Sequence, residues 1–418
     1  MSATTVPTDS PLMGRRELVV VLALLMSLNA LSIDAMLPAL DQIAADLAVE
    51  DGNRRQLVIA VYTITMGLGC LVPGIFADRF GRRPVILTAL VVYSTLSLVT
   101  AFLSNFEVLL WMRGAAGLLS AGLMVTPAAI VRDLYDGDRM ARLMSIVMAV
   151  FITVPVVAPS LGQAILLFAG WRWIFVALSA IGGLAFVWIY FRLPETLHPE
   201  SRQTIDVPVI ARNMKTSFVN RHAVGYVFGA ALLMGGVFGY VNSAQQLYQD
   251  HFGIGASFPI YFGATAAMMA FSNIVNSRIV MRFGARRVSH VGTLMFIAVS
   301  AVQVWSSYAH PGNIWWFMPL MSINLGLLGF LGANFSSIAM QPFANIAGAA
   351  SSVQTFFRMS GAAVVGVMIG QSYDGTALPF AWALLITSVL GLLLVLYSEK
   401  GVLFRRLHQP HSAEHPIR

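Results

Sequence analysis

Three charged side chains interrupt the long apolar runs of this sequence: Asp34, Arg113 and Arg358. Inside a bilayer an unpaired charge costs about 2.5 kcal/mol or more, so such a residue usually faces a cavity or a partner. Asp34 is the candidate for proton binding, because burial of a carboxyl group favours its neutral form. The alternative for Asp34 is a structural role, as an acid at the membrane interface or as a capping group near Pro38.

The two arginines leave similar alternatives open. We expect Arg113 to act in one of two ways: it forms an ion pair with Asp34 that exchanges with protonation of the acid, or it makes the electrostatic field in a cavity positive. The alternative is that its side chain extends to the headgroups of the outer leaflet. Arg358 is expected to bind an anionic or carbonyl group of a substrate, or to bridge two halves of the protein. A structural partner such as Asn273 or Asn334 is equally compatible with the sequence.

The composition indicates the environment of these charges. Of 418 residues, 57% are hydrophobic and 11% are charged, whereas soluble proteins carry about 25% charged residues. These values exclude a soluble enzyme, a disordered chain and a nucleic-acid-binding domain. Backbone that faces lipid must be helical, so the predicted fold is all-α, an integral membrane protein with twelve transmembrane helices. The expected spans are 17–38, 54–76, 84–104, 107–131, 141–167, 171–192, 222–248, 258–281, 288–308, 313–338, 347–371 and 377–400.

Residue types that support catalysis or metal binding are scarce in these spans. Cys70 is the single cysteine, and the eight histidines fall in loops, at helix ends or in the C-terminal tail. The spans contain no Ser/His/Asp set, metal-ligand cluster or phosphate-binding loop. We therefore expect neither an enzyme nor a cofactor, and no metal site.

The distribution of Lys and Arg predicts the orientation of the helices. With a cytoplasmic N-terminus, the outer loops hold only Arg54, Arg55 and Arg172 among the basic residues. Almost all others then fall in cytoplasmic segments, as positive residues do in membrane proteins. The net charge of +7 is therefore a topology signal, and both termini are expected to be cytoplasmic.

A polar segment at 193–221 is the longest break in apolar character. It predicts a cytoplasmic linker between two six-helix bundles, at 1–192 and 222–405, with a cytoplasmic tail at 406–418. The tripeptide at 79–81, Arg-Phe-Gly, recurs after the second span of the other half as Arg282-Phe283-Gly284. Six spans bring the chain back to the same side, so the repeat is parallel, and such repeats place a substrate site between the halves near the midplane.

The loop after the second span has the pattern G-x-x-x-D-R-x-G-R-R. Its residues are Gly74, Asp78, Arg79, Gly81, Arg82 and Arg83. Gly74 permits close helix packing, Gly81 permits a tight turn, and Asp78 can meet a helix N-terminus or a cation. The alternative is a topology anchor, since three arginines hold a loop in the cytoplasm whatever the function. The pattern resembles the signature loop of the major facilitator superfamily.

A second group of segments resembles one branch of that superfamily. The segments are 32–39, 130–141, 151–163, 171–175 and 194–196. Together they are similar to the bicyclomycin/chloramphenicol-resistance (Bcr/CflA) branch of drug:proton antiporters. The resemblance implies the major facilitator fold and export of small amphipathic antibiotics or toxic compounds across a bacterial inner membrane in exchange for protons. It also implies a multi-pass monomer whose partners are the drug, protons and the lipid bilayer.

The resemblance assigns roles to two further sets of residues. Arg82 and Asp133 are expected to form a cytoplasmic gate that favours the outward-open state and breaks as the halves rock; the alternative is a surface ion pair worth about 0–1 kcal/mol. Pro155, Pro159 and Gly162 are expected to kink and thin the fifth span, so that it approaches a helix of the other half.

The predicted substrate cavity combines an apolar wall, adaptable methionines and a few hydrogen-bonding groups, which suits a polyspecific pocket. Each candidate is about as compatible with packing between helices. The candidates are Asn29, Tyr62, Met66, Met124, Asn242, Gln245, Gln354, Phe357 and Arg358.

A proton-coupled importer of a small nutrient is the main alternative, because a fold alone does not set the direction of transport. The segment with Pro159 and Gly162, and the few polar groups in the cavity, favour export, since a sugar site needs many hydrogen bonds. A membrane enzyme or a sensor is less compatible with a sequence that contains no catalytic set and no signalling domain.

Overall fold

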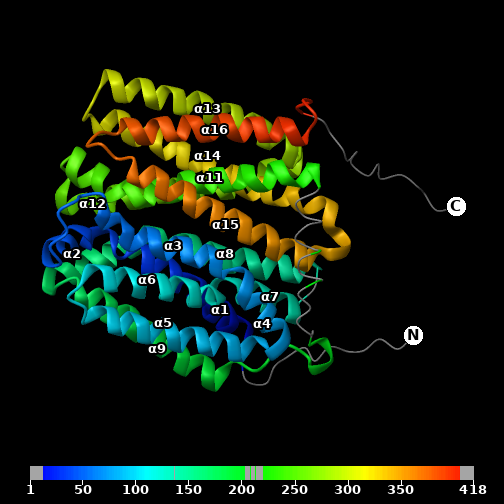
Figure 1. The fold of residues 1–418 in the computed structure, drawn as a ribbon. Coiled ribbons are helices and arrows are strands. Elements are labelled where there is room, and N and C mark those ends of the chain that lie inside the picture. Colours follow the sequence, from blue (N-terminus) through cyan, green and yellow to red (C-terminus); the bar gives the residue numbers. More distant parts are fainter. Residues whose placement is uncertain (1–12, 136, 203–207, 209–211, 213–219, 405–418) are drawn as a thin grey trace.

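The computed structural model describes residues 13–135, 137–202, 208, 212 and 220–404. Within this part of the chain the regular elements are all helices, most of them long and roughly side by side (Figure 1). The predicted linker lies partly outside the described residues, and the predicted tail at 406–418 lies wholly outside them.

The N-terminal half contains the helices of the first six predicted spans. They are α1 (Arg15–Asp34), η1 (Leu37–Ala39), α2 (Leu40–Asp46), η2 (Arg54–Gln56), α3 (Leu57–Gly69), α4 (Leu71–Phe80), α5 (Arg82–Ala101), α6 (Phe106–Ser120), α7 (Gly122–Leu134), α8 (Gly137–Phe168) and α9 (Arg172–Arg192). The short η3 (Pro199–Ser201) follows. The C-terminal half contains α11 (Arg221–Gln245), the π-helix η4 (Gln246–His251), η5 (Gly255–Ser257), α12 (Phe258–Phe283), α13 (Ala285–Ala309), α14 (Ile314–Met340), η6 (Gln341–Ile346), α15 (Ala347–Gln371) and α16 (Leu378–Ser398).

The described helices confirm the prediction of twelve spans when one bent pair is counted as a single span. Eleven spans are long and apolar enough to cross a membrane, and α3 with α4 makes the twelfth, bent by 45°. Pro73 has no N–H to donate to the carbonyl group of Gly69, which explains the break. The first span also continues past its predicted end at residue 38, because η1 and α2 extend it to Asp46.

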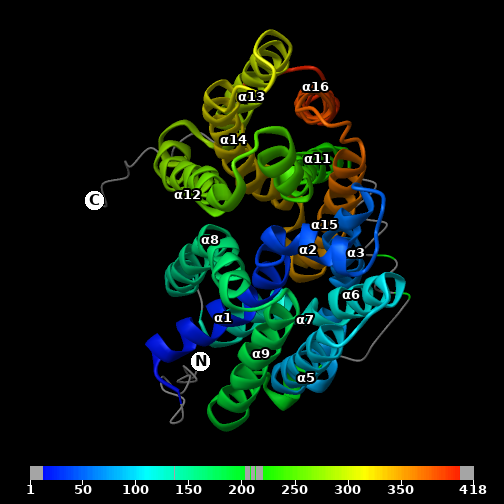
Figure 2. The ribbon, with the colours of Figure 1, turned by 90° about the vertical axis from the view of Figure 1, so that its left-hand side faces the viewer.

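The two halves form separate bundles that meet along two helix pairs, α3 with α15 and α8 with α12 (Figure 2). Glycines permit both approaches. A Cβ atom on Gly67 of α3 would lie 3.0 Å from the backbone of Ser360 in α15, and one on Gly263 of α12 would lie 3.3 Å from the carbonyl oxygen of Val156 in α8.

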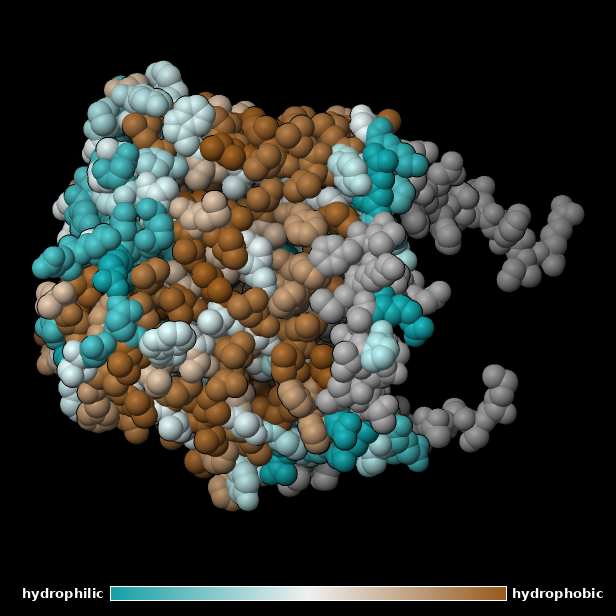
Figure 3. All heavy atoms as spheres, in the orientation of Figure 1, coloured by the Kyte–Doolittle hydropathy of each residue, from teal (hydrophilic) through white to brown (hydrophobic). Residues whose placement is uncertain are grey.

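On the face shown in Figure 3, an apolar belt lies between two more hydrophilic ends. Many large apolar side chains are exposed within the spans, and Trp111, Phe168, Leu184, Ile260 and Trp315 are each at least 71% exposed. Contact of such a surface with water is unfavourable, so the belt faces lipid. The chain is therefore a multi-pass membrane protein.

The internal repeat extends well beyond the tripeptide seen in the sequence. Gly81, between α4 and α5, has φ +109°, and Gly284, between α12 and α13, has φ +82°; both conformations favour glycine. Each half also carries a groove between its second, third and fourth spans, and the two grooves are lined at equivalent positions. Gly69, Val72, Phe76, Phe80 and Val85 line one, and Ser272, Val275, Ile279, Phe283 and Val288 line the other.

Candidate functional site

Asp34 lies buried at a break in the first span. α1 ends at this residue, and the chain makes a turn before it continues through η1 and α2. Asp34 is 5% exposed, and its carboxyl group forms no hydrogen bond or ion pair with any residue that the structure describes. In this conformation it is thus neither an exposed acid nor a cap for the broken helix.

The glycine of the antiporter-like segment packs against this break. A Cβ atom on Gly162 of α8 would collide with the carbonyl oxygen of Ala35 and would lie 3.2 Å from Pro38. The expectation that this glycine brings the fifth span toward the other half is therefore wrong, since it faces α1 of its own half. Val156 makes the approach to α12 instead, because six residues along a helix lead to a different face. Pro159 lies within α8, one turn before Gly162.

Arg113 reaches α1 without meeting Asp34. Its Nη1 donates to the hydroxyl of Ser32 (2.8 Å) and its Nη2 to the Ser32 carbonyl oxygen (3.0 Å), while Nε donates to the carbonyl oxygen of Val58 (2.9 Å). The guanidinium group lies 4.2 Å from the centre of the Tyr62 ring. The expected charge pair with Asp34 is absent here, and at 2% exposure Arg113 does not extend to the headgroups either.

The contact between Arg113 and Ser32 has a clear physical reason. The last turn of a helix leaves carbonyl groups without backbone partners, and α1 ends two residues after Ser32. A buried polar group without a partner costs about 1–3 kcal/mol. Arg113 supplies the missing donor and so stabilises the break at which Asp34 lies.

Asn29, Tyr62 and Ser120 form a compact hydrogen-bond network between α1, α3 and α6. The hydroxyls of Tyr62 and Ser120 both donate to Oδ1 of Asn29, at 2.6 and 2.9 Å, and Asn29 Nδ2 donates to the Ser120 carbonyl oxygen at 3.3 Å. Asn29 and Tyr62 are 3% and 0% exposed. These two cavity candidates therefore pack between helices in this conformation.

The signature loop forms an ion-pair cluster around a buried arginine. Arg82 is 4% exposed and contacts Asp78 through Nη1 (2.5 Å) and Asp133 through Nε (2.8 Å). The expected contact of Arg82 with Asp133 is thus present, and both residues belong to the N-terminal half; its function as a gate stays a prediction. Arg79 is exposed, and its guanidinium group lies 5.5 Å from the centre of the Phe80 ring.

Glu195 completes this cluster, and sequence analysis gave it no role. Its carboxylate accepts hydrogen bonds from the backbone N–H groups of Arg82 (2.8 Å) and Arg83 (3.1 Å), at the start of α5. The free N–H groups and the dipole of a helix N-terminus favour such an anion. A Cβ atom on Gly81 would collide with this carboxylate. Glycine is therefore favoured at this position for two reasons: it leaves space for Glu195, and it adopts the positive φ angle. Gly74 lies inside α4.

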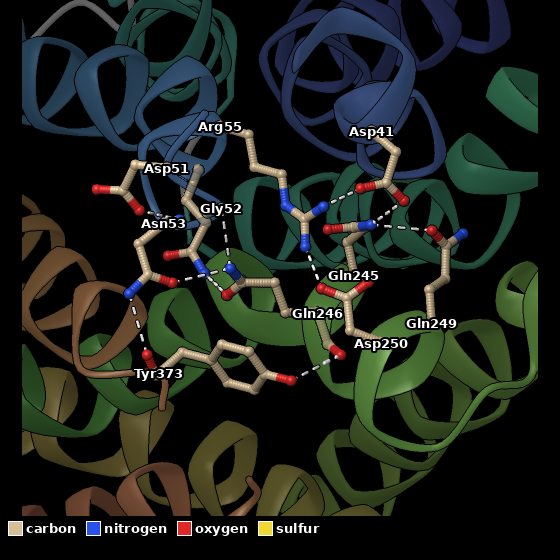
Figure 4. A network of polar contacts seen from close by, with 11 residues as sticks. Asp41, Asp51, Gly52, Asn53, Arg55, Gln245, Gln246, Gln249, Asp250 and Tyr373 are labelled. Atoms are coloured by element: carbon tan, nitrogen blue, oxygen red, sulfur yellow. Dashed lines mark hydrogen bonds and ion pairs between the residues drawn. The ribbon is translucent and has the colours of Figure 1, made fainter. Parts of the chain in front are cut away.

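A polar network that we call the outer seal joins the two halves at the end opposite the signature loop (Figure 4). The outer seal consists of Asp41, Asn53, Arg55, Gln56, Gln245, Gln246 and Asp250. Arg55 forms ion pairs with Asp41 of α2 and with Asp250 of η4, so one guanidinium group spans both bundles. Gln245 donates through Nε2 to Oδ2 of the same Asp41 at 2.5 Å.

Amide groups extend the outer seal to the end of α15. Gln246 Nε2 donates to Asn53 Oδ1 (2.9 Å), and Asn53 Nδ2 donates to the carbonyl oxygen of Tyr373 (3.0 Å). Beneath this layer, Asn242 is 1% exposed, and neither of its amide atoms has a hydrogen-bond partner among the described residues. The sequence showed these polar residues, but did not identify the seal that they form between bundles.

A small cavity of about 100 Å³ lies between α11, α14 and α15 beside Arg358. Arg358 donates through Nη1 to the hydroxyl of Ser336 at 2.5 Å. The expected alternative partners are engaged elsewhere: Asn334 pairs with Asn276 (3.0 and 3.1 Å), and Asn273 donates to a backbone carbonyl of its own helix (3.1 Å). The partner of Arg358 does come from the tenth span, but it is a serine.

The nine cavity candidates occupy separate places in this conformation. Gln354 and Arg358 line the small cavity, Gln245 belongs to the outer seal, and Met66 is 3% exposed. The remaining members are Asn29, Tyr62 and Asn242, placed above, and Met124 and Phe357, which are partly buried against the core.

Two bundles of long apolar helices that carry charged side chains between them are the architecture of a multi-pass membrane transporter. A sequence profile described as Major Facilitator Superfamily matches residues 22–366, and the chain belongs to that superfamily.

Similar proteins place the chain within the superfamily. It is 27% identical over 368 residues to a protein of Haemophilus influenzae named bicyclomycin resistance protein homolog. The aligned region covers 88% of this chain and 92% of that relative. The chain is 24% identical over 390 residues to multidrug resistance protein MdtL of Vibrio parahaemolyticus, covering 92% and 95%. These relatives confirm the expected branch. The solved structure of a D-xylose-proton symporter shares the fold, with TM-score 0.71, 15% identity and coverage of 92% and 96%.

Proposed function

We propose that the protein is a proton-coupled antiporter that exports small amphipathic antibiotics or toxic compounds by alternating access. The observation that carries this proposal is Asp34, a buried carboxyl group without a partner among the described residues. A lone acid inside a membrane bundle is suited to bind a proton on one side and release it on the other. The names of the relatives support the class of cargo.

The arrangement of charges supports an inward-facing state in which cargo loads. The outer seal joins the halves at one end. At the opposite end the described ion pairs stay within one half each, Arg82 with Asp133 and Arg286 with Glu399. The pair of Arg82 with Asp133 is therefore intact while the outer end is closed, so the breakage expected of it on leaving the outward-open state is not seen in this conformation. That end carries most of the arginines, so we propose that it faces the cytoplasm of a bacterial inner membrane, with both termini on that side.

The proton gradient supplies enough free energy for this exchange. One proton moving inward gains about 2.3 kcal/mol per 100 mV, and each unit of pH difference adds about 1.4 kcal/mol. A tenfold drug gradient needs about 1.4 kcal/mol, so one proton sustains a gradient of about a hundredfold.

The test is drug-dependent proton release from the purified protein in proteoliposomes, followed with a pH dye. Asp34→Asn should abolish proton-coupled export and leave the folded protein in the membrane. Asp46→Asn is the matched control, because Asp46 pairs with the exposed Arg172 at the outer surface (3.0 Å) and should retain coupling. Full coupling in Asp34→Asn would overturn the assignment of the proton site.

The direction of transport needs its own measurement. Cells that lack or overproduce the protein are challenged with antibiotics and dyes, with and without a protonophore. We expect overproduction to protect against some compounds, and the protonophore to remove the protection. Protection against none, together with energy-dependent uptake of a nutrient, would favour the importer.

A further inference from the structure

The cavity beside Arg358 holds a positive charge that no described acid neutralises. The Ser336 hydroxyl is the one described acceptor for this guanidinium group, and Nε is buried without a partner. Within η6 and α15, the positions whose side chains are not described, 344–349 and 352, contain no Asp or Glu. Cations among membrane-spanning helices usually pair with an acid or with backbone carbonyl groups, and Arg358 has neither partner among the described residues.

The walls of this cavity suit a small polar head group on an apolar body. Hydroxyl and amide groups come from Ser336, Ser351, Gln354 and Thr355, and apolar surface comes from Val227, Ala230, Ala339 and Met340. The volume of about 100 Å³ is well below the roughly 300–1,000 Å³ of a site for a whole drug-sized ligand. A cavity of this size accommodates one end of such a ligand and not the whole of it.

The remaining hydrogen-bond donors of Arg358 select an oxyanion. With Nη1 engaged by Ser336 and Nε enclosed by protein, Nη2 is the group left to donate to a ligand. A carboxylate accepts a charge-assisted hydrogen bond from such a group, which is about twice as strong as one between neutral groups. We infer that this cavity binds the carboxylate of an amphipathic organic acid, so that this transporter takes organic anions among its cargo. The inference rests on the proposed function and names a class of cargo for it.

This cargo changes the charge balance of transport. Outward movement of one monoanion in exchange for one inward proton carries the equivalent of two positive charges inward, so a membrane potential that is negative inside drives both movements. Each charge moved through 100 mV is worth about 50-fold in gradient. Exchange of one monocation for one proton carries no net charge and does not respond to the potential.

The binding test uses the purified full-length protein and three probes with one aromatic body: an aryl carboxylate, its methyl ester and the corresponding amine. We expect the wild type to bind the carboxylate more tightly than the ester. Arg358→Gln should weaken carboxylate binding by about tenfold to a hundredfold and leave ester binding unchanged. Arg358→Lys should recover part of the loss, because it restores the charge but not the planar guanidinium group that contacts Ser336 and the ligand together.

The control variant is Arg278→Gln, since Arg278 is an exposed arginine of α12 outside this cavity; it should bind the carboxylate like the wild type. Equal weakening of carboxylate and ester by Arg358→Gln would show a structural role and overturn the inference. So would a wild type that binds the ester as tightly as the carboxylate.

A transport arm separates this inference from the proposed function. In proteoliposomes with the potential set by potassium and valinomycin, carboxylate export should rise with an inside-negative potential in the wild type and not in Arg358→Gln. Export of the amine and the ester without any export of the carboxylate would overturn the inference and leave the proposed antiporter function standing. Failure to export all three probes, with carboxylate binding intact, would contradict the proposed function and leave the carboxylate-binding site standing.

Discussion

Arg113 donates hydrogen bonds to both the hydroxyl and the carbonyl group of Ser32, at 2.8 and 3.0 Å. This contact ties the fourth span to the first at Ser32, two residues before Asp34 and the break at which α1 ends. The shape of the candidate proton site therefore depends on an arginine that does not touch the acid in this conformation, and on the way α8 packs against the same break.

Substitution of Arg113 should reveal this supporting role. Arg113→Lys keeps the charge but cannot donate to Ser32 and Val58 together, and each lost hydrogen bond from a charged group costs about 1.5–3 kcal/mol. We expect a lower Tm in detergent and weaker proton coupling. Ser32→Ala removes only the hydroxyl contact and should lower Tm less. A lysine variant with the wild-type Tm would show that the break does not need this arginine.

The outer seal should control the balance between inward-facing and outward-facing states. Arg55→Ala removes the ion pairs that join the two halves. We expect it to raise the population open to the outside by about tenfold, equivalent to about 1.4 kcal/mol. The measure is the labelling rate of Asn242→Cys by a thiol reagent, in a Cys70→Ser background, because Asn242 is buried beneath the seal.

The adjacent Arg54 provides the control for this experiment. Its ion pair with Glu107 lies within the N-terminal half and is exposed, so Arg54→Ala should leave the labelling rate near that of the unmodified seal. An equal increase in both variants would mean that surface charge, rather than the link between the halves, determines access.

Alanine substitutions at the equivalent positions Gly81 and Gly284 distinguish the cost of backbone strain from the cost of steric crowding at the signature loop. Gly81 (φ +109°, ψ 161°) and Gly284 (φ +82°, ψ 145°) both lie in a backbone region that is essentially restricted to glycine, so alanine at either position should cost about 1–3 kcal/mol. At Gly81 the new Cβ atom would also collide with the carboxylate of Glu195, whereas at Gly284 it meets nothing within 4 Å. We expect Gly81→Ala to lower Tm more than Gly284→Ala. Equal shifts would indicate that Glu195 moves away without cost.

The packing of α8 against the helix break predicts a further contrast. Gly162→Ala should push α8 away from Ala35 and disturb the site of Asp34, at an overpacking cost of about 1–3 kcal/mol. Gly183→Ala in α9, where a Cβ atom has no neighbour within 4 Å, should leave Tm unchanged or raise it slightly. Drug-dependent proton release should fall in Gly162→Ala only. Wild-type proton coupling in Gly162→Ala would show that the packing of α8 does not determine the function of Asp34.

Local chemistry made much of this protein predictable from its sequence. A bilayer requires about 20 apolar residues and a fully bonded backbone for each crossing, and both properties belong to single segments, so the helices followed from apolar runs. The orientation was inferred from arginines near helix ends. The signature loop at 74–83 and the segments around Asp34 and Pro159 identified the family, because their spacing is a property of the chain itself.

The partners of the buried charges were decided only by the tertiary structure. Arg113 bonds to Ser32 and Val58 rather than Asp34, and Arg358 bonds to Ser336 rather than an asparagine. The outer seal joins Arg55 to an acid almost two hundred positions away. Which side chains meet across helices depends on the rotation, tilt and depth of each helix in its bundle, and these follow from packing of the whole molecule rather than from the residues of one segment.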